Sequence, residues 1–149
     1  MTRGAGSGRA AGIRAVQEAA AYVVRGHLAV ITELTGARVT ELTFSGGAAK
    51  GALWPQVIAD VLGLPVHVPA VTESSALGAA ICAGTGAGIY SSLDELRPQL
   101  RRRGATFEPH PAAVDSYDER YPAWRDIYAR MLGISEDGLL SPMWRAAGA

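Results

Sequence analysis

The sequence contains one cysteine, Cys82, and one lysine, Lys50, in 149 residues. A single cysteine cannot form a disulfide within the chain, and this scarcity is typical of proteins from a reducing, intracellular compartment. We therefore expect a cytoplasmic protein. Because Cys82 lies in the apolar run Ala79–Ala83, we expect it to be a small buried side chain rather than a reactive thiol. The other 13 of the 14 basic residues are arginines, which an arginine-biased genome explains.

Neither sign of charge is in excess, since 14 basic residues face 14 acidic ones. A neutral chain has no global electrostatic attraction for nucleic acid or for an anionic membrane. No apolar run approaches the ~20 residues that span a bilayer, and the first ten residues lack the hydrophobic segment of a signal peptide. We expect neither nucleic acid nor a membrane as a partner, and we interpret residues 1–12 as a disordered leader.

The remaining sequence alternates between helical and strand patterns. Apolar residues at three- and four-residue steps predict an amphipathic helix from Ile13 to Thr35. Alternation over residues 39–44 predicts a strand, and a second helix that begins near Ala52 ends at Gly63. Residues 65–69 predict a second strand. Its prolines at both ends suit a position near the edge of a sheet.

A third helix is predicted from Ser74 to about Ala83. Small residues on one side of it permit close approach of a neighbour, so we interpret it as a buried packing helix; they are Ala76, Gly78, Ala79, Ala80 and Ala83. The order strand, helix, strand, helix predicts an α/β fold with two parallel strands and a right-handed crossover. Typical sheets have about four to six strands. Two strands therefore indicate an incomplete domain.

The last third of the chain has a different character. A short helix is predicted over residues 91–103, and its end, Arg101–Arg103, is interpreted as a solvated helix terminus. A longer helix is predicted over residues 115–132, where Pro122 can divide it into two pieces. The apolar segment 138–144 is predicted to dock onto the body of the domain.

The most informative segment is Leu42–Gly51, where a strand leads into a glycine-rich turn and then a helix. Gly46 and Gly47 have no Cβ, so a ligand can approach their backbone closely. Open α/β sheets place ligands at the carboxyl ends of parallel strands, and we therefore expect this turn to hold a ligand. The turn is not a P-loop, because Ala52 follows Gly51 where that motif requires lysine.

No catalytic or metal-binding pattern accompanies the turn. His27, His67 and His110 lie in three different predicted elements, and none has a partner at metal-ligand spacing. The Gly-x-Ser-x-Gly motif of serine hydrolases is absent. Asp60 and Glu73 are candidate carboxylates, but both have structural positions, late in one helix and at the start of another. We predict no catalytic residue and no metal ligand in this chain.

Three segments in this order resemble the C-terminal domain of FGGY-family carbohydrate kinases. They are Phe44-Ser-Gly-Gly-Ala-Ala-Lys-Gly-Ala-Leu-Trp-Pro-Gln56, Ile58-Ala-Asp-Val-Leu-Gly-Leu-Pro-Val66 and Glu73-Ser-Ser-Ala-Leu-Gly-Ala-Ala80. Within the family, the runs 83–90 and 138–145 look most like autoinducer-2 kinases. The resemblance extends from about Ile13 to the end. It implies a partial actin-like, ribonuclease-H-like ATPase domain whose upstream antiparallel strands are missing.

The resemblance also implies an activity, since these kinases phosphorylate a sugar or polyol hydroxyl with Mg-ATP between two domains. Gly46, Gly47 and Ala48 would contact adenine and ribose, and Asp60 and Glu73 would be structural. Gly51 replaces a serine or asparagine that often bonds the nucleotide.

The catalytic aspartate and the sugar site would belong to an N-terminal domain, and Mg²⁺ would not be held by residues of this chain. Residues 13–149 would thus be the nucleotide-binding part of a kinase that is inactive without that domain. The alternative is a non-catalytic fragment that acts as a binding module.

Overall fold

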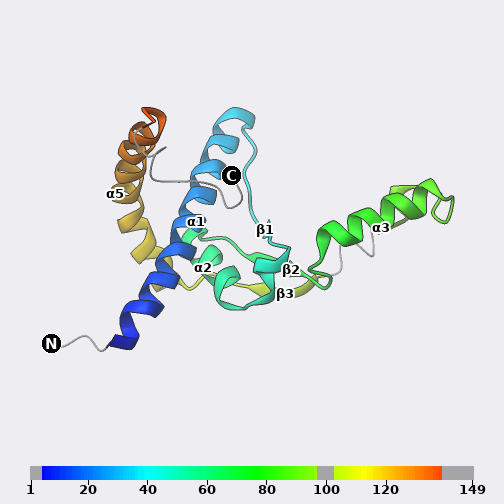
Figure 1. Ribbon diagram of the computed structural model, residues 1–149, viewed down its shortest axis with the longest axis horizontal. Helices are drawn as coiled ribbons and strands as arrows, with labels where there is room; N and C mark the ends of the chain where they lie inside the picture. The colour runs from blue at the N-terminus through cyan, green and yellow to red at the C-terminus, as the bar shows by residue number, and fades with distance from the viewer. Residues whose placement is uncertain (1–4, 97–102, 139–149) are drawn as a thin grey trace.

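The computed structural model of the chain describes residues 5–96 and 103–138. In chain order the elements are α1 (Ala5–Thr35), β1 (Leu42–Thr43), the 3-10 helix η1 (Gly47–Lys50), α2 (Leu53–Leu62), β2 (Val66–Pro69), α3 (Ser74–Gly86), the 3-10 helix η2 (Leu93–Leu96), β3 (Arg103–Phe107) and α5 (Pro111–Glu136). Figure 1 shows α1, α2 and α5 gathered on one side of the small sheet, while α3 extends away on the other side.

The sheet has the order β1-β2-β3 and is mixed. β1 and β2 are parallel, with Leu42 opposite Val66, so the predicted parallel pair is confirmed. β3 was not predicted, and it pairs antiparallel with β2. The predicted edge position of the second strand is therefore wrong, because β2 is central. Its prolines are tolerated because Pro65 precedes the strand and Pro69 lies at its end, where the pairing with β3 shifts register.

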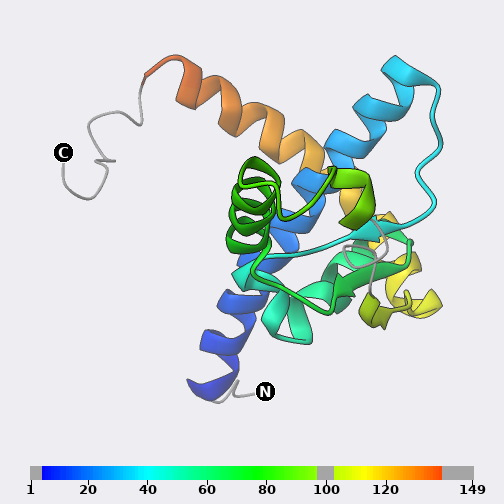
Figure 2. The same cartoon turned by 90° about the vertical axis from the view of Figure 1, so that its right-hand side faces the viewer.

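The core lies where α2 packs between the sheet and the two long helices (Figure 2). α2 contributes half of the buried apolar side chains, and α1, β2 and α5 contribute the others; they are Val57, Ile58, Ala59, Val61, Ala21, Tyr22, Val66 and Tyr117. Gly63 ends α2 as predicted: its φ of 64° is left-handed, and its N–H bonds the carbonyl of Ala59. α2 is thus the element that connects the sheet to α1 and α5.

An aromatic row on α5 packs against Tyr22 of α1. The rings of Trp124 and Tyr128 stack with centroids 4.9 Å apart, and the ring of Tyr22 lies 5.1 Å from that of Trp124. α5 runs without a break through Pro122, so the predicted interruption is wrong. A proline removes one helical hydrogen bond, and the ring contacts on the following turns oppose that loss.

Two other predicted segments differ from the structure. α1 begins at Ala5, so residues 5–12 of the predicted disordered leader are helical. The helix predicted over residues 91–103 is also wrong where it can be compared, since that stretch holds η2 and the first residue of β3. Residues 97–102, and the predicted apolar segment beyond Gly138, lie outside the described residues.

Helix α3 is exposed where we predicted burial. All five small residues of its predicted packing side are exposed, and only Ile81 and Gly84 of this helix are buried. Cys82 is exposed as well. Small residues show how closely a neighbour can approach, but no described element of the chain covers this side of α3. The predicted burial of α3 and of Cys82 is therefore wrong for the chain as described.

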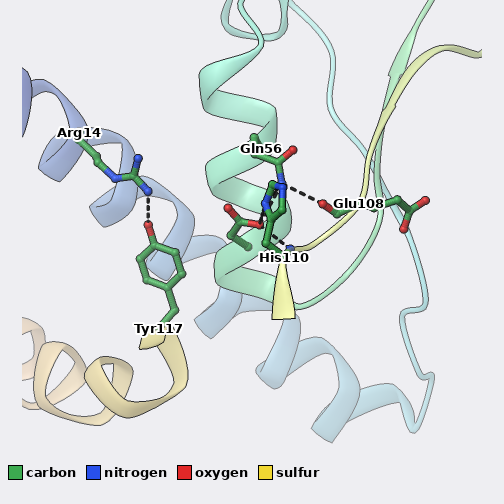
Figure 3. Close-up of polar contacts among 6 residues, drawn as sticks. Arg14, Gln56, Glu108, His110 and Tyr117 are labelled. Atoms are coloured by element: carbon green, nitrogen blue, oxygen red, sulfur yellow. Dashed lines mark hydrogen bonds and ion pairs between the residues drawn. The ribbon is translucent and has the colours of Figure 1, made fainter. Parts of the chain in front are cut away.

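We predict that Tyr117 makes the unfolding of this domain sensitive to alkaline pH. Its hydroxyl donates to Glu18 Oε1 at 2.7 Å and accepts from Arg14 Nη2 at 2.9 Å, the second of which Figure 3 shows. Burial, followed by the hydrogen bond to Glu18, raises the pKa of Tyr117 above its ordinary value. A phenol whose pKa is raised in the folded state stabilises the fold below its unfolded pKa of about 10, and this stabilisation is lost as pH rises further.

We therefore expect the free energy of unfolding to fall above about pH 10, and Tyr117→Phe to reduce that fall. Urea unfolding between pH 8 and pH 11 measures it, with Tyr128→Phe as the control because Tyr128 is exposed. Burial also raises the pKa of Tyr22, so part of the dependence persists in Tyr117→Phe. An unchanged pH dependence in that variant would contradict the assignment.

Candidate functional site

The glycine-rich turn lies at the carboxyl ends of the two parallel strands. The N–H of Phe44 donates to the carbonyl of His67 at 2.9 Å, which extends the β1–β2 pairing by one residue. The N–H of Gly46 then donates to the carbonyl of Thr72, also at 2.9 Å. Two segments that follow neighbouring strands are thus joined directly, at the edge where open α/β sheets bind ligands.

Gly46 is required by the backbone of the turn. Its φ of 92° and ψ of −175° lie in a region that is essentially restricted to glycine. This conformation directs the chain into η1, and Ala49 N–H closes that 3-10 turn on the Gly46 carbonyl at 3.1 Å. Ala49 is buried, so it anchors the turn to the body of the domain.

Neither the backbone conformation nor the packing of the chain requires glycine at positions 47 and 51. Neither has a positive φ, and a Cβ added to either would meet no atom within 4 Å. Both residues are exposed, and Ala48 between them is half-buried. The four predicted nucleotide-binding residues therefore lie together on one short turn. At Gly47 and Gly51 the backbone is open to close approach from outside.

A groove of about 380 Å³ lies beside the turn. Thr43 and Ser45 line it from the sheet side, and Gly78, Ile81 and Cys82 line it from α3. Two larger grooves of about 440 and 430 Å³ lie along α1. Gly46, Gly47, Ala48 and Gly51 line none of the three grooves, and the groove of 380 Å³ is the one next to them because Ser45 lines it.

Lys50 and Glu73 form an ion pair across the turn. Lys50 is the last residue of η1, and Glu73 immediately precedes α3. Sequence reasoning noted each of these residues separately but did not join them, and it missed the role of the Thr72 carbonyl. The sequence did contain a signal for the ion pair, namely a single lysine in the turn and a carboxylate at the start of α3. It contained no signal for the hydrogen bond that the Thr72 carbonyl accepts, because every residue has a backbone carbonyl.

Asp60, the other candidate carboxylate, is a structural residue. It is 5% exposed, and its Oδ1 accepts from Gln56 Nε2 at 2.9 Å and from the backbone N–H of His110 at 2.9 Å. His110 Nδ1 lies 3.1 Å from the same oxygen. Figure 3 shows Gln56 of α2 beside His110, with Gln56 also reaching the Glu108 carbonyl. Asp60 thereby fixes the start of α5 to α2, away from the glycine-rich turn.

His67 is likewise structural. It is 6% exposed, and its two ring nitrogens contact Glu41 Oε2 at 3.0 Å and Thr106 Oγ1 at 2.9 Å. Within residues 5–96 and 103–138, no group of three or more histidine, cysteine or acidic side chains could hold a metal ion. Nor is any helix in the same ranges both long and apolar enough to cross a membrane.

Comparison with known proteins gives consistent matches. The family described as "FGGY family of carbohydrate kinases, C-terminal domain" matches residues 2–87, which is more than half of the chain. Autoinducer-2 kinase from Enterobacter sp. (strain 638) is 44% identical over 135 residues, covering 91% of this chain and 26% of that protein. The enzyme of the same name from Klebsiella pneumoniae is also 44% identical, with 25% of it covered.

Two solved kinase structures also resemble this chain. Xylulose kinase from Rhodospirillum rubrum is 33% identical with a TM-score of 0.62, over 81% of this chain and 24% of that one. A glycerol kinase from Plasmodium falciparum, solved with ADP, is 26% identical with a TM-score of 0.61, over 79% of this chain and 23% of that one. The chain spans about a quarter of the length of the curated relatives it matches.

Proposed function

This chain belongs to the FGGY family of carbohydrate kinases through its C-terminal domain, and from this premise we propose that it is the nucleotide-binding portion of an ATP-dependent carbohydrate kinase. Residues 13–149 form that portion, and Gly46, Gly47, Ala48 and Gly51 contact the adenine and ribose of ATP. The observation that carries the proposal is the open backbone at Gly47 and Gly51, which neither backbone conformation nor packing within the chain requires. A flat base can stack on backbone that no Cβ covers.

The acceptor of the whole kinase is a hydroxyl of a sugar or polyol, and we propose autoinducer-2. The identity of 44% to two autoinducer-2 kinases supports this choice, because the xylulose and glycerol kinases are less similar at 33% and 26%. The residues that would bind this acceptor belong to an N-terminal domain that this chain does not match. The single cysteine of the chain supports a cytoplasmic enzyme.

The described residues do not fit a Mg²⁺ site. No three acidic, histidine or cysteine side chains gather within residues 5–96 and 103–138. Glu73, the carboxylate at the turn, is paired with Lys50. The Mg²⁺ that accompanies ATP in this family is therefore not assigned to these residues. Their contribution is to bind and orient the adenosine half of the nucleotide.

The second candidate function is a non-catalytic fragment that acts as a binding module. The exposed small-residue side of α3 favours it, because five small side chains there are open to a close-packing partner. Nucleotide binding distinguishes the two functions, since a module that acts through α3 requires no ligand on the turn.

Gly47→Leu tests the nucleotide site directly. A Cβ at this exposed position would meet no atom of the chain within 4 Å, so we expect little change in the unfolding temperature. The leucine side chain would occupy the space proposed for the base, so we expect the affinity for ADP to fall at least about tenfold, a cost of about 1.4 kcal/mol. Isothermal titration of the purified chain with ADP measures the affinity, and calorimetry measures the unfolding.

Gly46→Ala is the matched variant, and unlike Gly47→Leu it should also destabilise the fold. Alanine at φ 92° is strained by about 1–3 kcal/mol, so both stability and ADP affinity should fall. If Gly47→Leu binds ADP as tightly as the natural chain, the base does not lie on this turn. If the natural chain binds no ADP, the proposed function fails and the module is favoured.

A further inference from the structure

Helix α3 is attached to the rest of the chain mainly at its base. Figure 1 shows it extending away from the body formed by the sheet, α1, α2 and α5. Of its residues only Ile81 and Gly84 are buried, and Gly84 is covered by the ring of Tyr90 just beyond the helix. Because α3 makes few contacts with the other described elements, contacts near its first residue, Ser74, help to set its direction.

Two of these contacts lead to the glycine-rich turn. The carbonyl of Thr72 accepts the N–H of Gly46 at 2.9 Å, and Glu73 pairs with Lys50. Glu73 is the N-cap residue of α3, but its side chain makes no capping hydrogen bond. Its carboxylate instead pairs with Lys50, the residue that ends η1. The side chain that could cap α3 thus connects it to the turn.

The groove beside the turn depends on this connection. One of its walls is formed by Thr43 and Ser45, and the opposite wall by Gly78, Ile81 and Cys82 of α3. The angle of α3 to the turn therefore sets the width of a groove of about 380 Å³. A contact that fixes this angle also fixes the space next to the proposed base.

We infer that Lys50 is a positioning residue, whose ion pair with Glu73 holds helix α3 against the nucleotide turn and so keeps the groove at its binding width. The relevance of this positioning to ATP rests on the proposed function. The mechanical connection does not, and it can be measured without a ligand. Both side chains are more than half exposed, at 59% and 61%, so replacing either one leaves the core intact.

The experiment is hydrogen exchange of residues 74–86 in the purified chain without nucleotide. Exposed ion pairs contribute little, about 0.2–1 kcal/mol, so we expect exchange in α3 to become faster by a factor of about 1.4 to 5 in Lys50→Ala and in Glu73→Ala. The charge-reversed double variant, Lys50→Glu with Glu73→Lys, restores the pair and should restore the slow exchange. Equal rates in the natural chain and both single variants would overturn the inference.

Asp118→Ala is the matched control. It removes another exposed ion pair, Arg25 Nη2 to Asp118 Oδ1 at 2.7 Å, which connects α1 with α5. This variant should leave the exchange of residues 74–86 unchanged. If it accelerates α3 as much as Lys50→Ala does, the effect is global loosening, and the inference is wrong.

Titration with ADP then separates positioning from direct contact. If Lys50 acts through Glu73, Lys50→Ala weakens ADP binding, while Lys50→Arg and the charge-reversed double variant retain it. The charge-reversed double variant could restore slow exchange without restoring the affinity for ADP. In that case Lys50 contacts the nucleotide directly, and the inference that it acts in binding by positioning α3 is wrong. If no variant binds ADP, the natural chain included, the proposed function fails, while the exchange data still decide whether Lys50 holds α3.

Discussion

The purified 149-residue chain is expected to form no sugar phosphate from ATP and any carbohydrate. Phosphoryl transfer depends on positioning the acceptor and on neutralising charge on the phosphates. The proposed nucleotide contacts, Gly46, Gly47, Ala48 and Gly51, carry no acid, base or cation. The described residues also gather no metal-binding group. Coupled detection of ADP in the presence of Mg²⁺ and autoinducer-2 is the measurement.

Co-expression with an N-terminal kinase domain is the complementary experiment, in which activity is expected. A polypeptide that carries the N-terminal domain of an autoinducer-2 kinase should associate with this chain and raise turnover from background by at least about a thousandfold, the scale of a missing catalytic group. Gly47→Leu should remove most of that gain. Sugar phosphorylation by the isolated chain would contradict the proposal. A stable complex that stays inactive would favour the binding module.

Asp60→Ala is expected to cause the largest loss of stability. The variant leaves the backbone N–H of His110 and the amide of Gln56 without their acceptor, and it frees the start of α5 from α2. Removing a buried charged acceptor costs about 2–4 kcal/mol, a large part of the stability of a small domain. Urea unfolding followed by circular dichroism measures the loss.

Two neighbouring variants show which part of the contact matters. Asp60→Asn keeps an oxygen acceptor and should cost about 1 kcal/mol. His110→Ala removes a side chain that is 67% exposed but retains the backbone N–H, so its effect should be small. A loss in Asp60→Ala below about 0.5 kcal/mol, the range of ordinary surface changes, would show that Asp60 does not hold α5.

The elements predicted well are those determined by local signals. α2 has an apolar stripe and a left-handed glycine at its end, so residues 53–62 and the stop at Gly63 follow from nearby residues. The parallel pairing of β1 with β2 follows from the helix between them. The turn was located for the same reason, because two adjacent glycines between a strand and a helix form a local pattern.

The elements predicted badly depend on partners distant in sequence. β3 carries one large apolar residue, Phe107, and exists because β2 offers an open edge. α5 stays continuous at Pro122 because Tyr22, about 100 positions earlier in the chain, packs against its aromatic row. The connection between Lys50 and Glu73 spans a helix and a strand, so no local pattern links the two residues.

The exposure of Cys82 has a practical consequence. Because it is the sole thiol of the chain, a maleimide dye attaches to one defined position in every molecule, without prior mutagenesis. That position lines the same groove as Ser45, so the fluorophore lies beside the turn. Fluorescence from a singly labelled preparation can then follow, in real time, whatever enters the groove.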